Sequence, residues 1–135
     1  MSVRALAEIA SFHAHVYFDG AEQAAAARAL REHIAERFAV RLGSWRDQPV
    51  GPHAQPMFQI AFAPETFGTL VPWLMLNHNS LSILVHPNSG RPRDDHLRDR
   101  IWIGAALPLV EEVLPEREDE AETAGEPNTA PTLSP

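Results

Sequence analysis

The chain contains no cysteine and no lysine. Without cysteine it can form no disulfide and offers no thiolate as a metal ligand or nucleophile. Without lysine it can form no Schiff base with a carbonyl substrate, and it lacks the lysine of a phosphate-binding P-loop. With no thiolate available, imidazole with an optional carboxylate is the expected ligand set for a transition metal.

Basic charge is also scarce at one end of the chain. The formal net charge is -7, and residues 111–135 account for all of it, with eight acids and one arginine. The other 110 residues carry ten acids and ten arginines. This balance excludes the basic stripe of a nucleic-acid binder and the polybasic patch of a membrane-surface protein. We expect neither nucleic acid nor membrane as a partner.

Long apolar runs are absent. The apolar run in the first ten residues is too short for a signal peptide, and no stretch approaches the ~20 apolar residues of a membrane span. We expect a cytoplasmic protein.

A length of 135 residues favours one compact domain. We expect that domain to cover residues 1–114. Residues 115–135 are rich in Pro, Glu, Thr and Ala without hydrophobic periodicity, which predicts an acidic, Pro-rich, disordered tail. Such a tail should be removable without loss of stability.

Alternating side chains predict a strand over residues 11–18, SFHAHVYF. A helix should follow from Asp19, with Glu22 completing a capping box. Shorter patterns predict strands at 40–43, 57–62 and 81–87, a second helix starting at Pro64, and either a helix or an extended segment from Asp94 to Gly104. The order βαββαβ predicts an α+β, ferredoxin-like antiparallel sheet with helices on one face.

In that topology the first strand lies between the third and fourth, and the uncovered face must meet water or a partner. Two sheets packed face to face would enclose it, so we expect a homodimer. The polar residues of this face would line the enclosed space: His13, His15, Tyr17, Gln59, Ser82 and His86.

Three histidines are predicted to converge on this face. His13 and His15 point the same way from the first strand, and His86 lies where the fourth strand ends near them. Imidazoles with an optional carboxylate suit Fe(II), Zn(II) or Mn(II), and three protein ligands leave positions free for substrate. The alternative is a solvated sheet face that tolerates histidines.

The remaining histidines permit several interpretations. His53 lies on a loop between prolines, which suggests either a positioned side chain or a surface residue. His96 could begin a helix or support a metal ligand, and we expect His33 and His78 to be solvated. The three tryptophans are expected in the core or a dimer interface: Trp45, Trp73 and Trp102.

Five stretches in order, "FHAHVYFD", "LGSWRDQPVGPH", "LVPWLMLNH", "LSILVHPNSG" and "WIGAALPL", resemble the DOPA 4,5-dioxygenase family from about residue 10 to 110. The resemblance implies a ferredoxin-like fold that pairs into a dimeric α/β barrel. It also implies extradiol opening of a catechol ring with O₂ at a non-haem metal. Five residues match family histidines: His13, His15, His53, His86 and His96. One position departs from the family, since Arg46 follows Trp45 where a histidine is common, which leaves the substrate open.

From these observations we expect an Fe(II)-dependent dioxygenase, with Zn or Mn as possible metals, acting on a catechol such as DOPA. His13, His15 and His86 are the expected ligands. His53 and His96 are expected to be catalytic, His53 as an acid/base because an ordinary imidazole has a pKa near ~6.5. The expected substrate-binding residues are Tyr17, Arg46, Gln59 and Ser82.

Two other hypotheses stay open at this point. One is a dimeric metal- or small-molecule-binding module of the same fold that catalyses no reaction. The other treats all the histidines as surface residues, without a metal.

Overall fold

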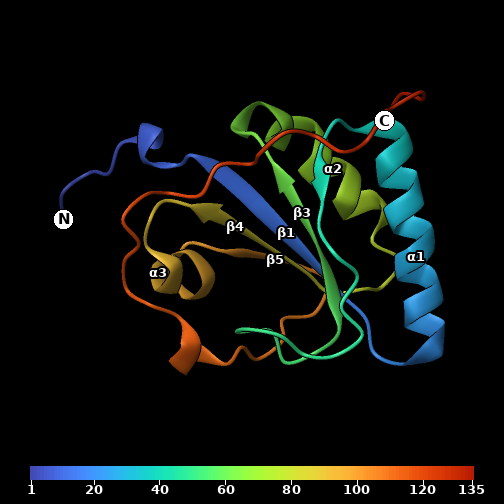
Figure 1. The fold of residues 1–135 in the computed structure, drawn as a ribbon, viewed down its shortest axis with the longest axis horizontal. Helices are drawn as coiled ribbons and strands as arrows, with labels where there is room; N and C mark the ends of the chain where they lie inside the picture. Colours follow the sequence, from blue (N-terminus) through green and yellow to red (C-terminus); the bar gives the residue numbers. More distant parts are fainter.

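The computed structural model describes all residues 1–135 and is built on one antiparallel sheet of five strands (Figure 1). The strands, in the spatial order β2-β3-β1-β4-β5, are β2 Arg41–Leu42, β3 Met57–Phe62, β1 Ser11–Tyr17, β4 Ile83–Asn88 and β5 Ile101–Ile103. The α+β class and the central place of β1 between β3 and β4 are as predicted. The expected four-strand sheet is extended by β5, in the segment whose structure the sequence left open.

Two long helices cover one face of the sheet: α1, Gly20–Arg37, and α2, Phe67–Asn77. They pack on the alternate strand residues that the sequence assigned to the core, including Val16, Phe58 and Ile60. The predicted capping box is not formed, because the Asp19 amide donates to Gln23 Oε1 at 2.9 Å and Glu22 takes no part. No helix combines the length and hydropathy that crossing a membrane would require.

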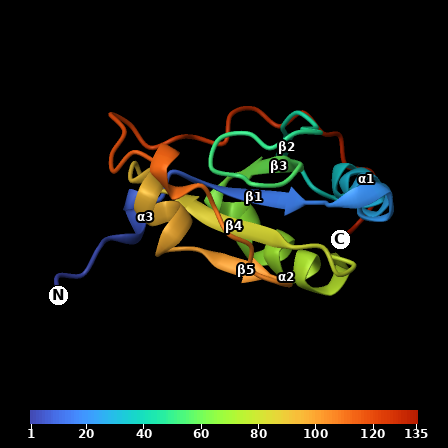
Figure 2. The same cartoon turned by 90° about the horizontal axis from the view of Figure 1, so that it is seen from below.

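The second face of the sheet is covered within the single chain, contrary to the expectation of helices on one face only. A short helix, α3, Pro92–Leu97, lies over it together with the loop 43–56 and the C-terminal segment. Figure 2 shows this loop and segment on the side of the sheet opposite α2. The uncovered face from which a dimer was expected is therefore not present in the single chain.

The C-terminal residues 115–135 contain no helix or strand, yet they are hydrogen-bonded along the domain. Glu118 N–H donates to the Gly90 carbonyl at 2.9 Å. Asn128 pairs with both backbone groups of Leu42, at 2.7 and 2.9 Å. This arrangement differs from the expected disordered tail. The segment lacks apolar periodicity because it docks through polar side chains and backbone groups.

Candidate metal centre

Three histidines meet on the second face of the sheet, at the pairing of β1 with β4. His13 lies directly opposite His86 in the antiparallel register, and His15 follows two residues later on the same face because strand side chains alternate. All three residues are at least 95% buried. One ligand atom from each lies within 4.8 Å of the others, as the topology predicted.

Two further histidines approach from the elements that cover this face. His53 is held by backbone bridges to Val50 and Leu109, which fold the loop back over β1 within the same chain. His96 comes from α3, and its ring centroid is 3.9 Å from that of His86. With His15 these two form a second group of potential ligands. The interpretation of all these histidines as surface residues is therefore wrong.

Backbone carbonyls orient two of the rings. His86 Nδ1 is 2.8 Å from the Pro87 carbonyl oxygen, and His96 Nδ1 is 2.7 Å from that of Pro92. A carbonyl oxygen only accepts hydrogen bonds, so each Nδ1 must carry the proton. In the neutral ring the Nε2 lone pair is then free to bind a metal or a proton.

His53 is held in the opposite tautomer by Tyr17. The Tyr17 hydroxyl lies 2.6 Å from His53 Nδ1, and burial raises the pKa of this phenol, so it keeps its proton. The phenol has no other hydrogen-bond acceptor, so it donates to Nδ1. The ring proton of neutral His53 is then on Nε2, which becomes a hydrogen-bond donor rather than a metal ligand.

The contacts among the nitrogens fit a bound cation. His15 Nε2 and His86 Nε2 are 3.0 Å apart, and since the His86 proton is on Nδ1, only a proton or a cation between the two nitrogens avoids repulsion. Metal–nitrogen bonds of about 2.0–2.1 Å bring two ligands of one ion to a similar separation. His13 Nε2 is buried without a hydrogen-bond partner. These donors fit a divalent metal that accepts imidazole ligands.

Burial favours the neutral form of His15, His53, His86 and His96, which is the form of an imidazole that binds metals. Desolvation, followed by the proximity of the other histidines, lowers the pKa of His15 and His86 well below the ordinary value. Desolvation lowers the pKa of His53 to about 4, and it also lowers that of His96. His53 is therefore a weaker base in the metal-free protein than its ordinary pKa suggested.

A small polar cavity of about 180 Å³ opens onto the histidines. It is lined by His13, His15, His53, Gln59, Asn88, Pro92, Asp95, His96, Glu118 and Glu122. Of the expected substrate-binding residues, Gln59 lines the cavity and Tyr17 contacts it through His53. Ser82 and Arg46 do not line it. Ser82 lies beyond Tyr17, and Arg46 is an exposed residue paired with Met57 at the edge of the sheet.

Several residues that line the cavity were not predicted from the sequence. Asp95 accepts hydrogen bonds from the Ser89 amide at 3.0 Å and from its hydroxyl at 2.5 Å, which fixes the turn into α3 and hence the place of His96. The pair of adjacent aspartates before His96 is the sequence feature from which a role for Asp95 could have been predicted. Glu118 and Glu122 carried no such signal, because they lie in a polar segment without periodicity.

A model of the Dopa 4,5-dioxygenase family matches residues 12–113, which include the five histidines of the candidate site. A protein described as an uncharacterized 21.2 kDa protein, from Botryotinia fuckeliana, is 41% identical over 110 residues, covering 73% of this chain and 60% of that protein. A DOPA 4,5-dioxygenase of Amanita muscaria is 35% identical over 121 residues, covering 84% of this chain and 53% of the fungal enzyme. The chain thus spans between half and two thirds of the length of these curated relatives.

A solved structure shares the fold. The crystal structure of a provisionally assigned dioxygenase from Nostoc punctiforme PCC 73102 superposes with a TM-score of 0.80 at 50% sequence identity. The match covers 82% of this chain and 96% of that one. Since the family model ends at residue 113, Glu118 and Glu122 lie outside the part of the chain that it describes.

Proposed function

Because the chain belongs to the Dopa 4,5-dioxygenase family, we propose that it is a non-haem metal-dependent dioxygenase that opens the ring of a catechol by extradiol cleavage. The observation that carries this proposal is the group of three buried imidazoles whose nitrogens converge on one point beside a polar cavity. The Amanita muscaria relative is named a DOPA 4,5-dioxygenase, and the transfer of such an activity to this chain is a proposal.

We assign the metal to His13, His15 and His86. The second group, made by His15, His53 and His96, is disfavoured because the Tyr17 hydroxyl leaves the His53 proton on Nε2. Fe(II) is the proposed ion, with Zn(II) or Mn(II) as alternatives that the same donors accept. When bound, it would supply a site where the two catechol oxygens and O₂ meet side by side, so that electrons can pass from ring to oxygen.

The other two histidines, His53 and His96, have separate roles in the cavity, one as a hydrogen-bond donor and the other as a proton acceptor. His96 offers an Nε2 lone pair, because its Nδ1 proton is held by the Pro92 carbonyl, and it can take a proton from a catechol hydroxyl. His53 presents its Nε2–H to the cavity and can donate a hydrogen bond to an oxygen on which negative charge develops. Gln59 and Asn88 supply neutral polar groups that can orient the ring.

The test is anaerobic loading with Fe(II), followed by absorbance scans after a panel of catechols and then O₂ are added. A new absorption band from a ring-opened product is expected only with both metal and O₂. Metal that binds stoichiometrically but gives no product with any catechol would contradict the proposal and favour a binding module without turnover.

The ligand assignment is tested by metal content of single variants. His15→Ala should lose the metal under either grouping. His13→Ala and His86→Ala should lose it only if our assignment holds, whereas His96→Ala should retain it. His33→Ala, which changes an exposed histidine on α1, is the matched control and should retain metal fully.

Homodimer formation and a cytoplasmic location, both expected from the sequence, stay predictions. The family resemblance supports the dimer, although the second face of the sheet is already covered in one chain. Light scattering at micromolar concentration should give twice the mass of the 14.9 kDa chain.

A further inference from the structure

The short helix α3 contributes to two separate hollows. Part of it lines the histidine cavity, namely Pro92, Asp95 and His96. The rest of it lines a second hollow of about 490 Å³, through Arg93, Asp94, Leu97 and Arg98. No residue is common to the two hollows. A helix that covers the histidines thus presents another set of side chains to solvent.

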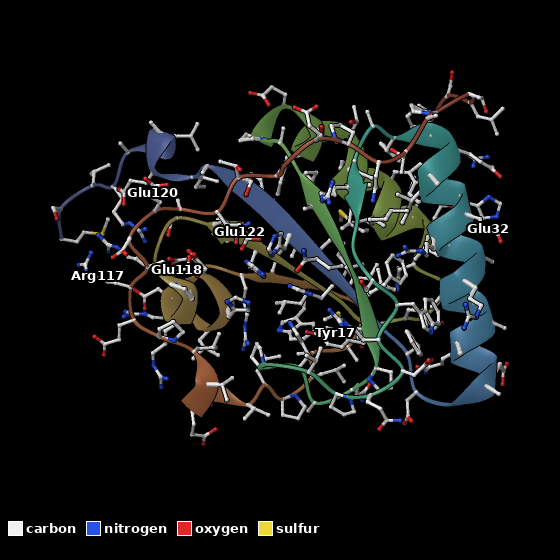
Figure 3. All side chains as sticks on the ribbon, viewed as in Figure 1. Tyr17, Glu32, Arg117, Glu118, Glu120 and Glu122 are labelled. Atoms are coloured by element: carbon white, nitrogen blue, oxygen red, sulfur yellow. The ribbon has the colours of Figure 1, made fainter.

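The C-terminal segment is divided in the same way. Its residues Glu118 and Glu122 line the histidine cavity, whereas Glu116 and Arg117 line the second hollow. Figure 3 shows Arg117 where this segment passes α3. The second hollow is therefore bounded by two of the elements that cover the histidine face.

Positive charge is concentrated in this hollow. Its complete lining is Arg91, Arg93, Asp94, Leu97, Arg98, Glu116 and Arg117. Four arginines against two acids give a formal charge of +2, in a chain whose net charge is -7. We call this site the arginine hollow.

The guanidinium groups of the arginine hollow are loosely paired. Arg91, Arg93 and Arg98 lie 3.9, 3.8 and 3.8 Å from their nearest carboxylate oxygens, which is too long for a hydrogen bond. Arg117 is exposed and forms no ion pair. Arg93 donates to the Glu111 carbonyl, which orients the side chain without neutralising its charge. Charge and N–H donors therefore stay available to a ligand.

The residue types of the hollow indicate the ligand. A guanidinium group matches phosphate in shape, because two of its N–H groups can donate to two phosphate oxygens. The arginines lie on two walls, one made by α3 and the turn before it and the other by Arg117, so two anionic groups on one ligand can contact both. The lining contains one apolar residue, Leu97, and no aromatic ring on which a nucleobase could stack.

We propose that the arginine hollow binds a compact metabolite that carries two phosphate groups, such as a sugar bisphosphate. The bound ligand would bridge α3 and the C-terminal segment, and it would thereby brace the cover of the histidine cavity. The inference does not depend on the ring-opening reaction, because the hollow and the histidine cavity share no lining residue.

The first measurement is calorimetric titration of the full chain at low ionic strength. The ligands are fructose 1,6-bisphosphate, fructose 6-phosphate and fructose, which differ in the number of phosphate groups. We expect one saturable site for the bisphosphate, with an affinity about five- to tenfold higher than for the monophosphate, and no binding of fructose. Addition of 0.5 M NaCl should weaken the binding, since the charges are solvent-exposed.

The second measurement uses arginine variants. In Arg98→Gln/Arg117→Gln the affinity for the bisphosphate should fall about tenfold, because each exposed charge pair contributes up to about fivefold. Both side chains are exposed, so the fold should be retained. Arg28→Gln/Arg46→Gln changes the net charge equally through two exposed arginines outside the hollow, and this matched control should keep the affinity.

The third measurement locates the ligand by hydrogen exchange and mass spectrometry. With the bisphosphate bound, peptides that cover residues 91–98 and 115–122 should exchange more slowly, and this protection should be lost in Arg98→Gln/Arg117→Gln. Three results would each overturn the inference: no saturable binding of the bisphosphate, equal affinity in this double variant, or protection confined to other parts of the chain.

Discussion

Tyr17 and His53 are joined across the covered face of the sheet, with the phenol oxygen 2.6 Å from Nδ1 of the imidazole. Tyr17 is on the central strand β1, and His53 is on the loop 43–56 that folds back over it. Because the phenol is buried and keeps its proton, it determines which nitrogen of His53 faces the cavity as a donor. This one contact separates the role of His53 from that of the histidines whose Nε2 is unprotonated.

We predict that Tyr17→Phe retains the metal, whereas the ring proton of His53 is no longer confined to Nε2. Without the phenol, Nδ1 and Nε2 become comparable sites for the ring proton. Nitrogen-15 NMR of the Zn(II)-loaded protein should show a single Nε2–H form before the substitution and a mixture after it. His86, whose proton is held by the Pro87 carbonyl, is the internal control and should not change. An unchanged His53 spectrum would show that Tyr17 does not set the tautomer.

We predict that His53→Ala retains metal while turnover of a catechol falls by about 10²-fold, the usual scale for a group that acts on protons or developing charge. The reason is that its Nε2–H faces the cavity as a donor and is not needed for coordination. Metal content and steady-state rates of the same sample check this. Loss of metal from His53→Ala, with retention by His13→Ala, would mean that ligand and proton donor have been exchanged.

We predict that the metal-free protein becomes less stable as the pH falls from about 6.5 towards 4. The unfolded chain binds protons on histidine near pH 6.5, whereas burial lowers the folded-state pKa of His53 to about 4 and also lowers the pKa values of His15, His86 and His96. The unfolded state therefore binds more protons in this window, and the free energy of unfolding decreases on acidification. His53 alone accounts for about 3 kcal/mol of this decrease in the free energy of unfolding between about pH 6.5 and 4.

Urea unfolding in the presence of EDTA, at a series of pH values from 7 to 4, measures this loss. His33→Gln, which replaces an exposed histidine on α1, serves as the substitution control. A free energy of unfolding that stays constant between pH 6.5 and 5 would contradict the burial of four neutral imidazoles.

We predict that deletion of residues 116–135 lowers the thermal midpoint by about 3–8 °C, against the sequence expectation of no effect. The deletion removes the hydrogen bonds of Asn128 and Thr129 to the segment 38–42, each of which contributes about 0.5–1.5 kcal/mol before the entropy of ordering the tail is subtracted. Truncation after Leu133 removes only two residues without hydrogen bonds to the domain and is the control. Identical midpoints would show that the tail does not dock in solution.

Much of the site could be predicted from the alternation of side chains along the strands. The alternation in SFHAHVYF places His13 and His15 on one face, and the βαββαβ order puts His86 opposite them, because an antiparallel register is determined by which side chains must enter the core. The resemblance to the Dopa 4,5-dioxygenase family added His53 and His96. These predictions depend on local patterns and on short connections, which a sequence displays directly.

What the sequence by itself determined is the α+β sheet, the core face with Val16 and Ile60, and the identity of the converging histidines. Only the tertiary structure decided which elements cover the histidine face and which nitrogen of each ring points inward. The cover is made by α3, an irregular loop and a polar tail, whose positions depend on long-range hydrogen bonds rather than on periodic burial. The tautomers depend on partners such as Pro87, Pro92 and Tyr17, whose contact atoms are defined only once the chain has folded.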